Sequence, residues 1–413
     1  MKPTLRFSGY ENEWQKLTID QLYIEVIDGD RGTNYPTKSE FLDEGDCLFL
    51  SAKNVTKSGF EFVEKQYITK DKDAALRKGK LLRNDLVLTT RGTVGNIAHF
   101  NNSVEEEQIR INSGMVILRN SNPNLSNDFL YKSFYTGAVT RHIQKVLFGS
   151  AQPALTVGEI KKFKIGFTGI EEQQKIADFL SSVDKKISLL KEKHALLTQY
   201  KKGVMQKLFK QDIRFKDENG NDFPEWQTVP LSKLASKNSK KNKDESVNTV
   251  LTNSAKDGIV NQGDYFKKDI ANQQNLGGYT VVEKNDFVYN PRISELAPVG
   301  PIKRNHIGQG VMSPLYTVFR FKDDSLLDYL ELYFNTTMWH RYMHSIANFG
   351  ARHDRMNITT SDFYALPLPI PSEGERAKIV SFVNALEAKV SAVKQQIELT
   401  QTFKKGLLQQ MFV

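Results

Sequence analysis

Two long stretches of the chain repeat an apolar residue at alternating steps of four and three positions. Residues 170–210 form the first stretch and residues 372–413 the second. This spacing is the a/d pattern of helices that pack in a coiled coil, and it predicts two helices, each about 60 Å long at about 1.5 Å per residue. The positions expected at the helix interface are Ile176, Leu180, Val183, Ile187 and Leu190 in the first stretch and Ile379, Val383, Leu386, Val390 and Val393 in the second.

The second stretch also carries a helix start signal. Three prolines precede Ser372, and Glu375 stands three residues further on, which is the spacing of a capping box. We therefore expect these two side chains to bond to the first turn of the helix. His194 stands at one of the apolar interface positions of the first stretch. A lone histidine at such a position usually sets the register of the helix pair, and it is seldom a ligand.

The two halves of the chain repeat each other. KKGVMQKLF, which starts at Lys201, returns as KKGLLQQMF from Lys404, an offset of 203 that all the interface positions share. The repeat extends outside the helices, since residues 128–143 match residues 328–343. The domains predicted are a globular unit at 1–169, a long helix at 170–210, a second globular unit at 211–371 and a second long helix at 372–413.

The predicted fold class is α+β. Each globular unit reads as a mixed α/β domain of many short strands, with one helix over residues 127–146 in the first and 327–347 in the second. The long helices are expected to form an antiparallel coiled coil within the chain, with pseudo-two-fold symmetry; pairing between two chains is the alternative. The sequences of the two units differ most in their central segments. This favours one scaffold that carries two different recognition surfaces; the alternative is a duplicated domain whose loops diverged without a functional reason.

The composition adds a class of partner. The net charge of +9 and the pI of about 9.2 suit a polyanion, either nucleic acid or an anionic membrane surface. The single cysteine, Cys47, excludes an intrachain disulfide framework and a cysteine-based metal cluster, and we expect it to be small, apolar and half-buried. No apolar run reaches the ~18 residues that span a bilayer, and the first residues lack a signal-peptide core, so we expect a cytoplasmic protein.

Several segments resemble the specificity subunits of type I restriction–modification enzymes. They are residues 170–187 and 372–390 at the helix starts, KKGVMQKLF and KKGLLQQMF at the helix ends, TTRGTVGNI at 89–97 and FGSAQPALT at 148–156. The resemblance covers essentially the whole chain. It implies that the chain is not an enzyme, and that each globular unit is a target-recognition domain reading one half of a bipartite site in double-stranded DNA.

The resemblance also implies the partners. In this family the helices hold the two recognition domains apart and dock two methyltransferase subunits, to which translocase–endonuclease subunits are added for restriction. S-adenosylmethionine and ATP are then used by those partners, so that no cofactor and no metal is expected on this chain.

Candidate DNA contacts are side chains at turns, because arginine pairs with guanine, asparagine or glutamine with adenine, and cations or hydroxyls with phosphate. In the first unit the turn after a predicted strand offers Thr89, Thr90, Arg91 and Thr93, and a second loop offers Ser150 and Gln152. Lys53, Asn54 and Arg141 are further candidates, although a solvated surface position is the simpler interpretation of each.

The second unit departs from the family-like sequence at both places. YNPRISELAPVG, from Tyr289, stands where the first unit has LTTRGTVG, and FGARHDRMNIT, from Phe349, stands where it has FGSAQPALT. Arg292 still aligns with Arg91, so a different half-site read by the same scaffold is expected. The candidates in this unit are Asn290, Arg292, Arg352, His353 and Arg355.

Catalytic motifs are missing from the sequence. Asn290-Pro291 is only half of the Asn-Pro-Pro-aromatic tetrad of an amino-methyltransferase, and there is no phosphate-binding glycine loop with Gly-Lys-Ser/Thr. His340 and His344 have the spacing of a zinc-binding helix, but Arg341 stands where glutamate is expected. Two other interpretations remain: an enzyme with two DNA-binding domains, and a coiled-coil scaffold with no role in nucleic-acid binding.

Overall fold

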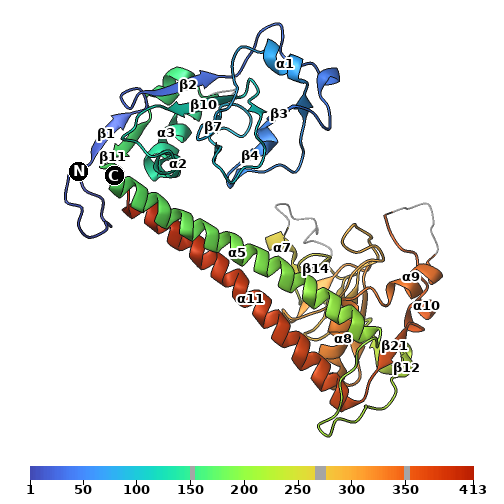
Figure 1. Cartoon of the computed structure of the whole chain (residues 1–413). Helices are drawn as coiled ribbons and strands as arrows, with labels where there is room; N and C mark the ends of the chain where they lie inside the picture. The colour runs from blue at the N-terminus through green and yellow to red at the C-terminus, as the bar shows by residue number, and fades with distance from the viewer. Residues whose placement is uncertain (149–153, 266–275, 348–353) are drawn as a thin grey trace. The chain divides into compact units, whose positions relative to one another are not determined.

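The computed structural model describes residues 1–148, 154–265, 276–347 and 354–413 (Figure 1). The chain forms two compact units, and each contains one globular domain together with parts of both long helices. Unit 1 comprises Met1–Glu192 and Lys394–Val413, and unit 2 comprises Lys193–Val393.

The two long helices form where the apolar repeat predicts them, α5 at Ile170–Phe209 and α11 at Glu373–Gln410. Within unit 1 the first half of α5 packs against the last half of α11, and Lys404 Nζ lies 2.5 Å from Asp184 Oδ1. Within unit 2 the second half of α5 packs against the first half of α11, with an ion pair between Lys201 and Glu387. The pairing is therefore antiparallel and within one chain, as the predicted fold class requires.

The stripe positions lie in the cores of the units. Unit 1 buries Ile176, Leu180, Val183 and Ile187 of α5 with Leu407, Leu408 and Met411 of α11. Unit 2 buries Met205 and Leu208 of α5 with Ile379 and Val383 of α11. Leu386, Val390 and Val393 are also buried, whereas Leu190 and His194 are half-buried.

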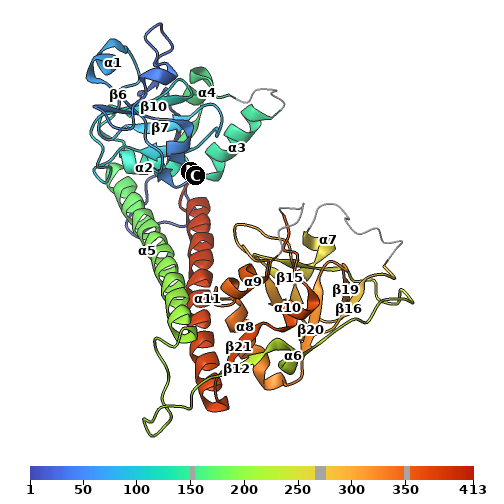
Figure 2. The ribbon, with the colours of Figure 1, turned by 90° about the vertical axis from the view of Figure 1, so that its right-hand side faces the viewer.

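Unit 1 contains a four-stranded antiparallel sheet in the order β2 (Ile24–Asp28), β10 (Met115–Asn120), β7 (Leu86–Thr89), β8 (Ile97–His99). The helices α2 (Asn127–Ser133) and α3 (Gly137–Leu147) pack against one face of it (Figure 2). The remaining elements are β1 (Gln15–Thr18) paired with β11 (Lys164–Phe167), β3 (Cys47–Phe49) between β6 (Tyr67–Ile68) and β9 (Ile109–Arg110), the hairpin β4 (Val55–Thr56) and β5 (Gly59–Phe60), α1 (Lys70–Ala75) and α4 (Val157–Lys161).

Unit 2 repeats this frame. Its four-stranded sheet has the order β13 (Ala235–Lys237), β20 (Thr317–Phe321), β17 (Phe287–Tyr289), β18 (Ile302–Arg304), and β12 (Gln227–Pro230) pairs with β21 (Pro367–Ile370). The other elements are β14 (Leu251–Ser254) with β15 (Gly258–Asn261), β16 (Thr280–Val282) with β19 (Gly310–Met312), and the helices α6 (Leu231–Leu234), α7 (Gln262–Tyr265), α8 (Leu327–Phe334), α9 (His340–Ile346) and α10 (Thr360–Tyr364).

The central strand of each sheet is buried on both faces. In β7, Leu86 and Leu88 face the core that contains α2 and α3, whereas Val87 faces a second core on the other side. In β17, Phe287 and Val288 divide in the same way between two cores. Because side chains alternate along a strand, a continuous apolar run is what such a strand requires.

A buried carboxylate ties three segments together at the start of each long helix. In unit 1, Glu172 accepts hydrogen bonds from Arg6 Nε at 2.7 Å and from Trp14 Nε1 at 3.2 Å. In unit 2, Glu375 accepts from Arg214 Nε at 3.1 Å and from Trp226 Nε1 at 2.8 Å. We call these two arrangements the helix-start latches. Each joins its long helix to the segment that precedes the first strand of the domain.

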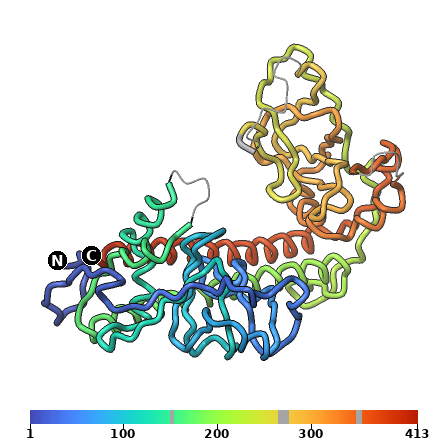
Figure 3. Tube along the Cα trace, turned by 90° about the horizontal axis from the view of Figure 1, so that it is seen from above, coloured from blue at the N-terminus to red at the C-terminus, as the bar shows by residue number. Residues whose placement is uncertain are grey.

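The two ends of the chain meet beside the first latch (Figure 3). The backbone N–H of Leu5 donates to the carbonyl of Gln410 at 2.9 Å, and the ring of Trp14 packs edge-on against that of Phe412. The same end of α11 thus completes the core of unit 1.

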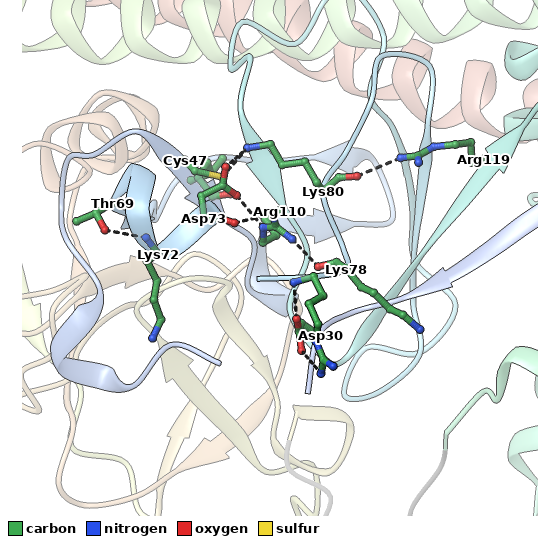
Figure 4. Close-up of polar contacts among 11 residues, drawn as sticks. Asp30, Cys47, Thr69, Lys72, Asp73, Lys78, Lys80, Arg110 and Arg119 are labelled. Atoms are coloured by element: carbon green, nitrogen blue, oxygen red, sulfur yellow. Dashed lines mark hydrogen bonds and ion pairs between the residues drawn. The ribbon is translucent and has the colours of Figure 1, made fainter. Parts of the chain in front are cut away.

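An ionic cluster joins α1 to β9 and to the segment before β7 in unit 1 (Figure 4). Asp73 accepts hydrogen bonds from Arg110 Nε at 2.7 Å and from Lys80 Nζ at 2.5 Å. Burial would raise the pKa of Asp73, but these two cations hold it below its usual value. Cys47 lies 3.5 Å from Lys80 Nζ and is fully buried rather than half-buried. Burial raises the pKa of the Cys47 thiol to about 11, so it stays protonated near neutral pH.

Two sequence-based expectations about helices are wrong. The single helix expected over residues 127–146 is two helices, α2 and α3, because Thr136 is extended and its hydroxyl bonds back to the carbonyl of Ser133; Thr336 breaks the equivalent helix in unit 2. The capping box at Ser372 does not form. Glu375 is taken by Arg214 and Trp226, and Ser372 Oγ has no hydrogen bond with a described residue.

We predict that Glu172→Gln lowers the free energy of unfolding by about 2 to 3 kcal/mol, because hydrogen bonds to a buried charge are lost and Arg6 is left unpaired. Burial raises the pKa of Glu172, but Arg6, Thr168 and Trp14 lower it further than burial raises it, so the net shift is downward. The latch therefore stabilises the fold above the ordinary glutamate pKa, and this stabilisation disappears as the pH falls through the lowered value.

The measurement is urea unfolding of wild type and variant from pH 7 to pH 3. The matched control is Glu171→Gln, which removes an exposed carboxylate from the same helical turn and leaves the latch intact. The proposed stabilising role of the latch would be contradicted if the Glu172 variant and the wild type were equally stable at pH 7. It would also be contradicted if the difference in stability grew on acidification.

Candidate nucleic-acid interface

The candidate interface of unit 1 is a turn between β7 and β8, residues Thr89–Gly95, which we call arginine turn 1. Thr89 is buried, and its hydroxyl donates to the carbonyl of Thr93 and accepts from the backbone N–H of Asn96 at 3.0 Å. Gly95 has φ +93°, a conformation that side-chain-bearing residues rarely adopt. These constraints fix the turn and leave the side chains of Arg91 and Thr93 exposed.

Arginine turn 2 comprises residues 290–300 of unit 2, between β17 and β18. Asn290 is buried; its Nδ2 donates to the carbonyl of Asn253 at 3.0 Å and its Oδ1 accepts from the backbone N–H of Arg292 at 3.0 Å. Gly300 has φ +77°, and a Cβ there would lie 2.1 Å from the carbonyl oxygen of Asn290. The side chain of Arg292 is exposed at this turn.

The two turns share one hydrogen-bonded frame. The N–H of Thr89 donates to the carbonyl of Asn96 at 2.9 Å, and that of Asn290 donates to Pro301 at 3.0 Å.

A second bond ties each turn to a later segment. Leu155 N donates to the carbonyl of Thr90 at 3.0 Å, and Met356 N donates to that of Pro291 at 2.9 Å. Arg91 and Arg292 therefore occupy equivalent backbone positions, and so do Ala154 and Arg355.

Arginine turn 2 brings two cations together. Arg292 and Arg355 face each other in an antiparallel β-bridge. The carboxylate of Asp354 lies 3.5 Å from Arg355 Nε, which makes no hydrogen bond with a described residue. Like charges directly opposite each other destabilise a strand pair, so the site favours an anion between or beside them.

A helix flanks each turn. A Cβ on Gly95 would lie 3.3 Å from Ile143, so arginine turn 1 packs directly against α3, whose exposed face carries Arg141. In unit 2, α9 carries Arg341 at the matching place of the repeat, and it is exposed as well. Arg341 was not among the predicted contacts, although the match of residues 128–143 with 328–343 contained the signal.

Two aspartates with arginine partners anchor the central strands. Asp85, before β7, lies 2.7 Å from Arg119 Nη2, and Asp286, before β17, lies 2.7 Å from Arg320 Nε. The hydrogen bond that each arginine donates to its aspartate raises the pKa of that arginine. These arginines are paired with carboxylates of the sheet frame.

Some predicted contact residues point inward. Asn54 is buried, with Oδ1 accepting from Ser51 N at 2.9 Å and Nδ2 donating to the carbonyl of Glu64 at 2.7 Å. Lys53 is exposed and paired with Glu64 at 2.7 Å. Thr89, Thr90 and Asn290 are buried and shape the turns. Ser150, Gln152, Arg352 and His353 lie outside the described residues.

The described residues hold no group of three or more His, Cys, Asp or Glu side chains that could bind a metal ion. Within the same residues, no helix is both long enough and apolar enough to cross a membrane.

Each unit combines one globular domain with parts of both long helices, and the two domains share one strand order. Residues 11–199 match the family model described as type I restriction modification DNA specificity domain. Two relatives come from Methanocaldococcus jannaschii. The MjaIX specificity subunit is 24% identical over 49% of this chain and 48% of its own length, and the putative MjaX specificity subunit is 22% identical over 86% and 84%. This chain thus spans about half the length of the first relative.

Solved structures agree in fold. The S subunit of a type I restriction–modification system from M. genitalium has a TM-score of 0.53 and 16% identity, with 100% of this chain and 99% of that chain covered. The HsdS subunit from Thermoanaerobacter tengcongensis has a TM-score of 0.51 and 15% identity, with 97% of both chains covered. Residues 11–199 thus match a DNA specificity domain of type I restriction–modification systems, and the fold of the whole chain is similar to that of their specificity subunits.

We predict that the buried and exposed members of arginine turn 1 differ in their effect on stability. Thr89→Val removes a buried hydroxyl that accepts from the N–H of Asn96 and costs about 1 to 3 kcal/mol. Arg91→Ala removes an exposed side chain without a described partner and changes stability by less than about 0.5 kcal/mol. Urea unfolding measures both, with Thr89→Ser as the control that keeps the hydroxyl. A larger loss for Arg91→Ala than for Thr89→Val would contradict this division.

Proposed function

We propose that this chain reads a bipartite sequence in double-stranded DNA for a type I restriction–modification complex, with one half-site read by each unit. The observation that supports the proposal is one turn frame that recurs with different side chains around it. Asn290 and Arg355 stand in unit 2 where Thr89 and Ala154 stand in unit 1. A shared frame can present two sets of side chains to two different base sequences.

The charge of the chain agrees with this role. A net charge of +9 favours a polyanionic partner, and the exposed arginines of both turns are placed to meet one. The proposal locates the protein in the cytoplasm, with the host DNA. The coiled coil sets the spacing of the two half-sites, because it is the element that both units share.

We further propose that the long helices dock two methyltransferase subunits. Large apolar side chains are exposed at equivalent places of the repeat, with exposed fractions of 54–62%. They are Leu196 and Tyr200 on α5, and Leu399 and Phe403 on α11. Two equivalent apolar surfaces suit two copies of one partner.

Chemistry is then divided between subunits. The methyltransferases bind S-adenosylmethionine and transfer the methyl group, and translocase–endonuclease subunits that use ATP join the complex for restriction. This chain contributes DNA binding and orientation. Its part in the reaction is to place the adenine of each half-site where a docked methyltransferase can reach it.

We predict that exchanging residues 1–169 for the first unit of another specificity subunit changes one half of the recognised sequence and leaves the other half unchanged. The measurement is the set of methylated adenines in the genome of a strain that expresses the hybrid chain with its methyltransferase. The control is the parent chain in the same strain. A change in both halves would contradict independent reading, and no methylation motif for the parent chain would contradict the function itself.

We predict that changing one exposed apolar pair to glutamine removes one methyltransferase from the complex. The first variant is Leu196→Gln with Tyr200→Gln, and the second is Leu399→Gln with Phe403→Gln. Each should lower the number of bound methyltransferases from two to one, and the four changes together should abolish binding. The helix content should stay constant, because these side chains are more than half exposed.

The mass of the co-purified complex, measured by light scattering, gives the stoichiometry. Lys191→Gln is the control, since it alters an exposed polar side chain of α5. Two bound methyltransferases in the fourfold variant would show that the partner docks elsewhere.

A further inference from the structure

The arginines of this chain fall into two groups by their contacts. Most bond to a carboxylate, a backbone carbonyl or another polar group; Arg6, Arg119 and Arg320 are examples. Among the described residues, the arginines whose side chains have no hydrogen bond, ion pair or ring contact are Arg91, Arg141, Arg292 and Arg341. All of them are exposed.

These unpartnered arginines form two equivalent pairs. Arg91 and Arg292 occupy the same position of the shared turn frame, as the matching hydrogen bonds of that frame show. Arg141 and Arg341 occupy the same position of the repeat, on α3 and α9. Each unit therefore presents one unpartnered arginine on its turn and one on its flanking helix.

The turn and the helix are packed together in each unit. In unit 1, Val94 of the turn packs against the core that contains Ile143 of α3. In unit 2, Ile293 of the turn packs against the core that contains Met343 of α9. The two arginines of each unit thus stand on elements that a common core holds rigid.

We propose that Arg91 and Arg141 in unit 1, and Arg292 and Arg341 in unit 2, bind backbone phosphates and position each unit on DNA, whereas bases are read by side chains that differ between the units. This inference rests on the proposed function and extends it. The two half-sites have different base sequences. A side chain that recurs at the same position in both units therefore cannot account for the difference between them. Phosphate contacts position a protein without specifying sequence.

Arg355 belongs to the side chains that differ between the units and are proposed to read bases. It faces Arg292 across the β-bridge, but its equivalent in unit 1 is Ala154. A cation present in one unit only can carry information about one half-site only, so Arg355, on the segment that pairs with arginine turn 2, is the side chain assigned to a base.

The test uses the full chain in complex with its methyltransferase, two duplexes and a range of salt. One duplex carries the methylation motif mapped in the host genome, and the other has random sequence. Arg91→Ala, Arg141→Ala, Arg292→Ala and Arg341→Ala should each weaken binding to both duplexes about equally, by roughly eightfold at about 0.1 M salt. Each should lower the slope of log affinity against log salt by about one, and the methylation motif should stay unchanged.

The charge-retaining variants give the matched control. Arg91→Lys and Arg292→Lys should keep most of the affinity and the salt slope, because a phosphate accepts any cation, whereas paired hydrogen bonds to guanine need the arginine fork. Arg355→Ala should instead relax the motif at one position in one half-site and leave the binding of random DNA nearly unchanged.

The outcomes separate the inference from the proposed function. If Arg91→Ala or Arg292→Ala relaxes the motif, or if Arg→Lys is as harmful as Arg→Ala, these arginines read bases and the inference is wrong while the function stands. Unchanged affinity in all four alanine variants would also overturn it. If the wild-type complex binds neither duplex, the proposed function fails and the inference fails with it.

Discussion

The burial of two apolar helix stripes against each other is the constraint on which this structure depends. A helix of about forty residues with an exposed stripe is not stable by itself, since each aliphatic side chain of the stripe gains about 1.5 to 3 kcal/mol on burial. The repeat makes the two stripes equivalent, and antiparallel pairing lets each half of α5 meet the opposite half of α11. Each globular domain continues into a long helix, because its last strand, β11 or β21, is followed directly by α5 or α11.

The helix-start latches connect the domains to that pair. Glu172 and Glu375 are buried, and each is bonded to an arginine and a tryptophan from the segment that enters its domain. The entering segment and the start of the long helix therefore meet at one carboxylate in each unit. A buried carboxylate is tolerated only when charged and polar partners satisfy it, which explains why the glutamate is not free to cap its own helix.

The apolar periodicity of the sequence correctly predicted the elements that local patterns determine. Predictions failed for features that depend on tertiary contacts. The long helices, their partners and the repeated frame follow from apolar spacing and from the match between halves. The break at Thr136 and the loss of the capping box at Ser372 do not, because both depend on which neighbour takes a hydroxyl or a carboxylate. Of the candidate site, Arg91 and Arg292 are exposed, but Thr89, Asn54 and Asn290 are buried. Residue type alone does not tell a polar side chain that shapes a turn from one that faces a ligand.

The division between paired and unpaired arginines has an energetic reason. In the frame, Asp85 and Asp286 neutralise Arg119 and Arg320, so that the sheets keep their form whether or not a ligand is present. At the turns no carboxylate of a described residue pairs with Arg91 or Arg292, and unpaired cations repel one another in the absence of an anion. Affinity from phosphate contacts does not depend on base sequence. Under the proposed function, a scaffold that obtains its affinity in this way can exchange the side chains that read bases and still bind DNA. The exchange of Ala154 in unit 1 for Arg355 in unit 2 is a change of this kind.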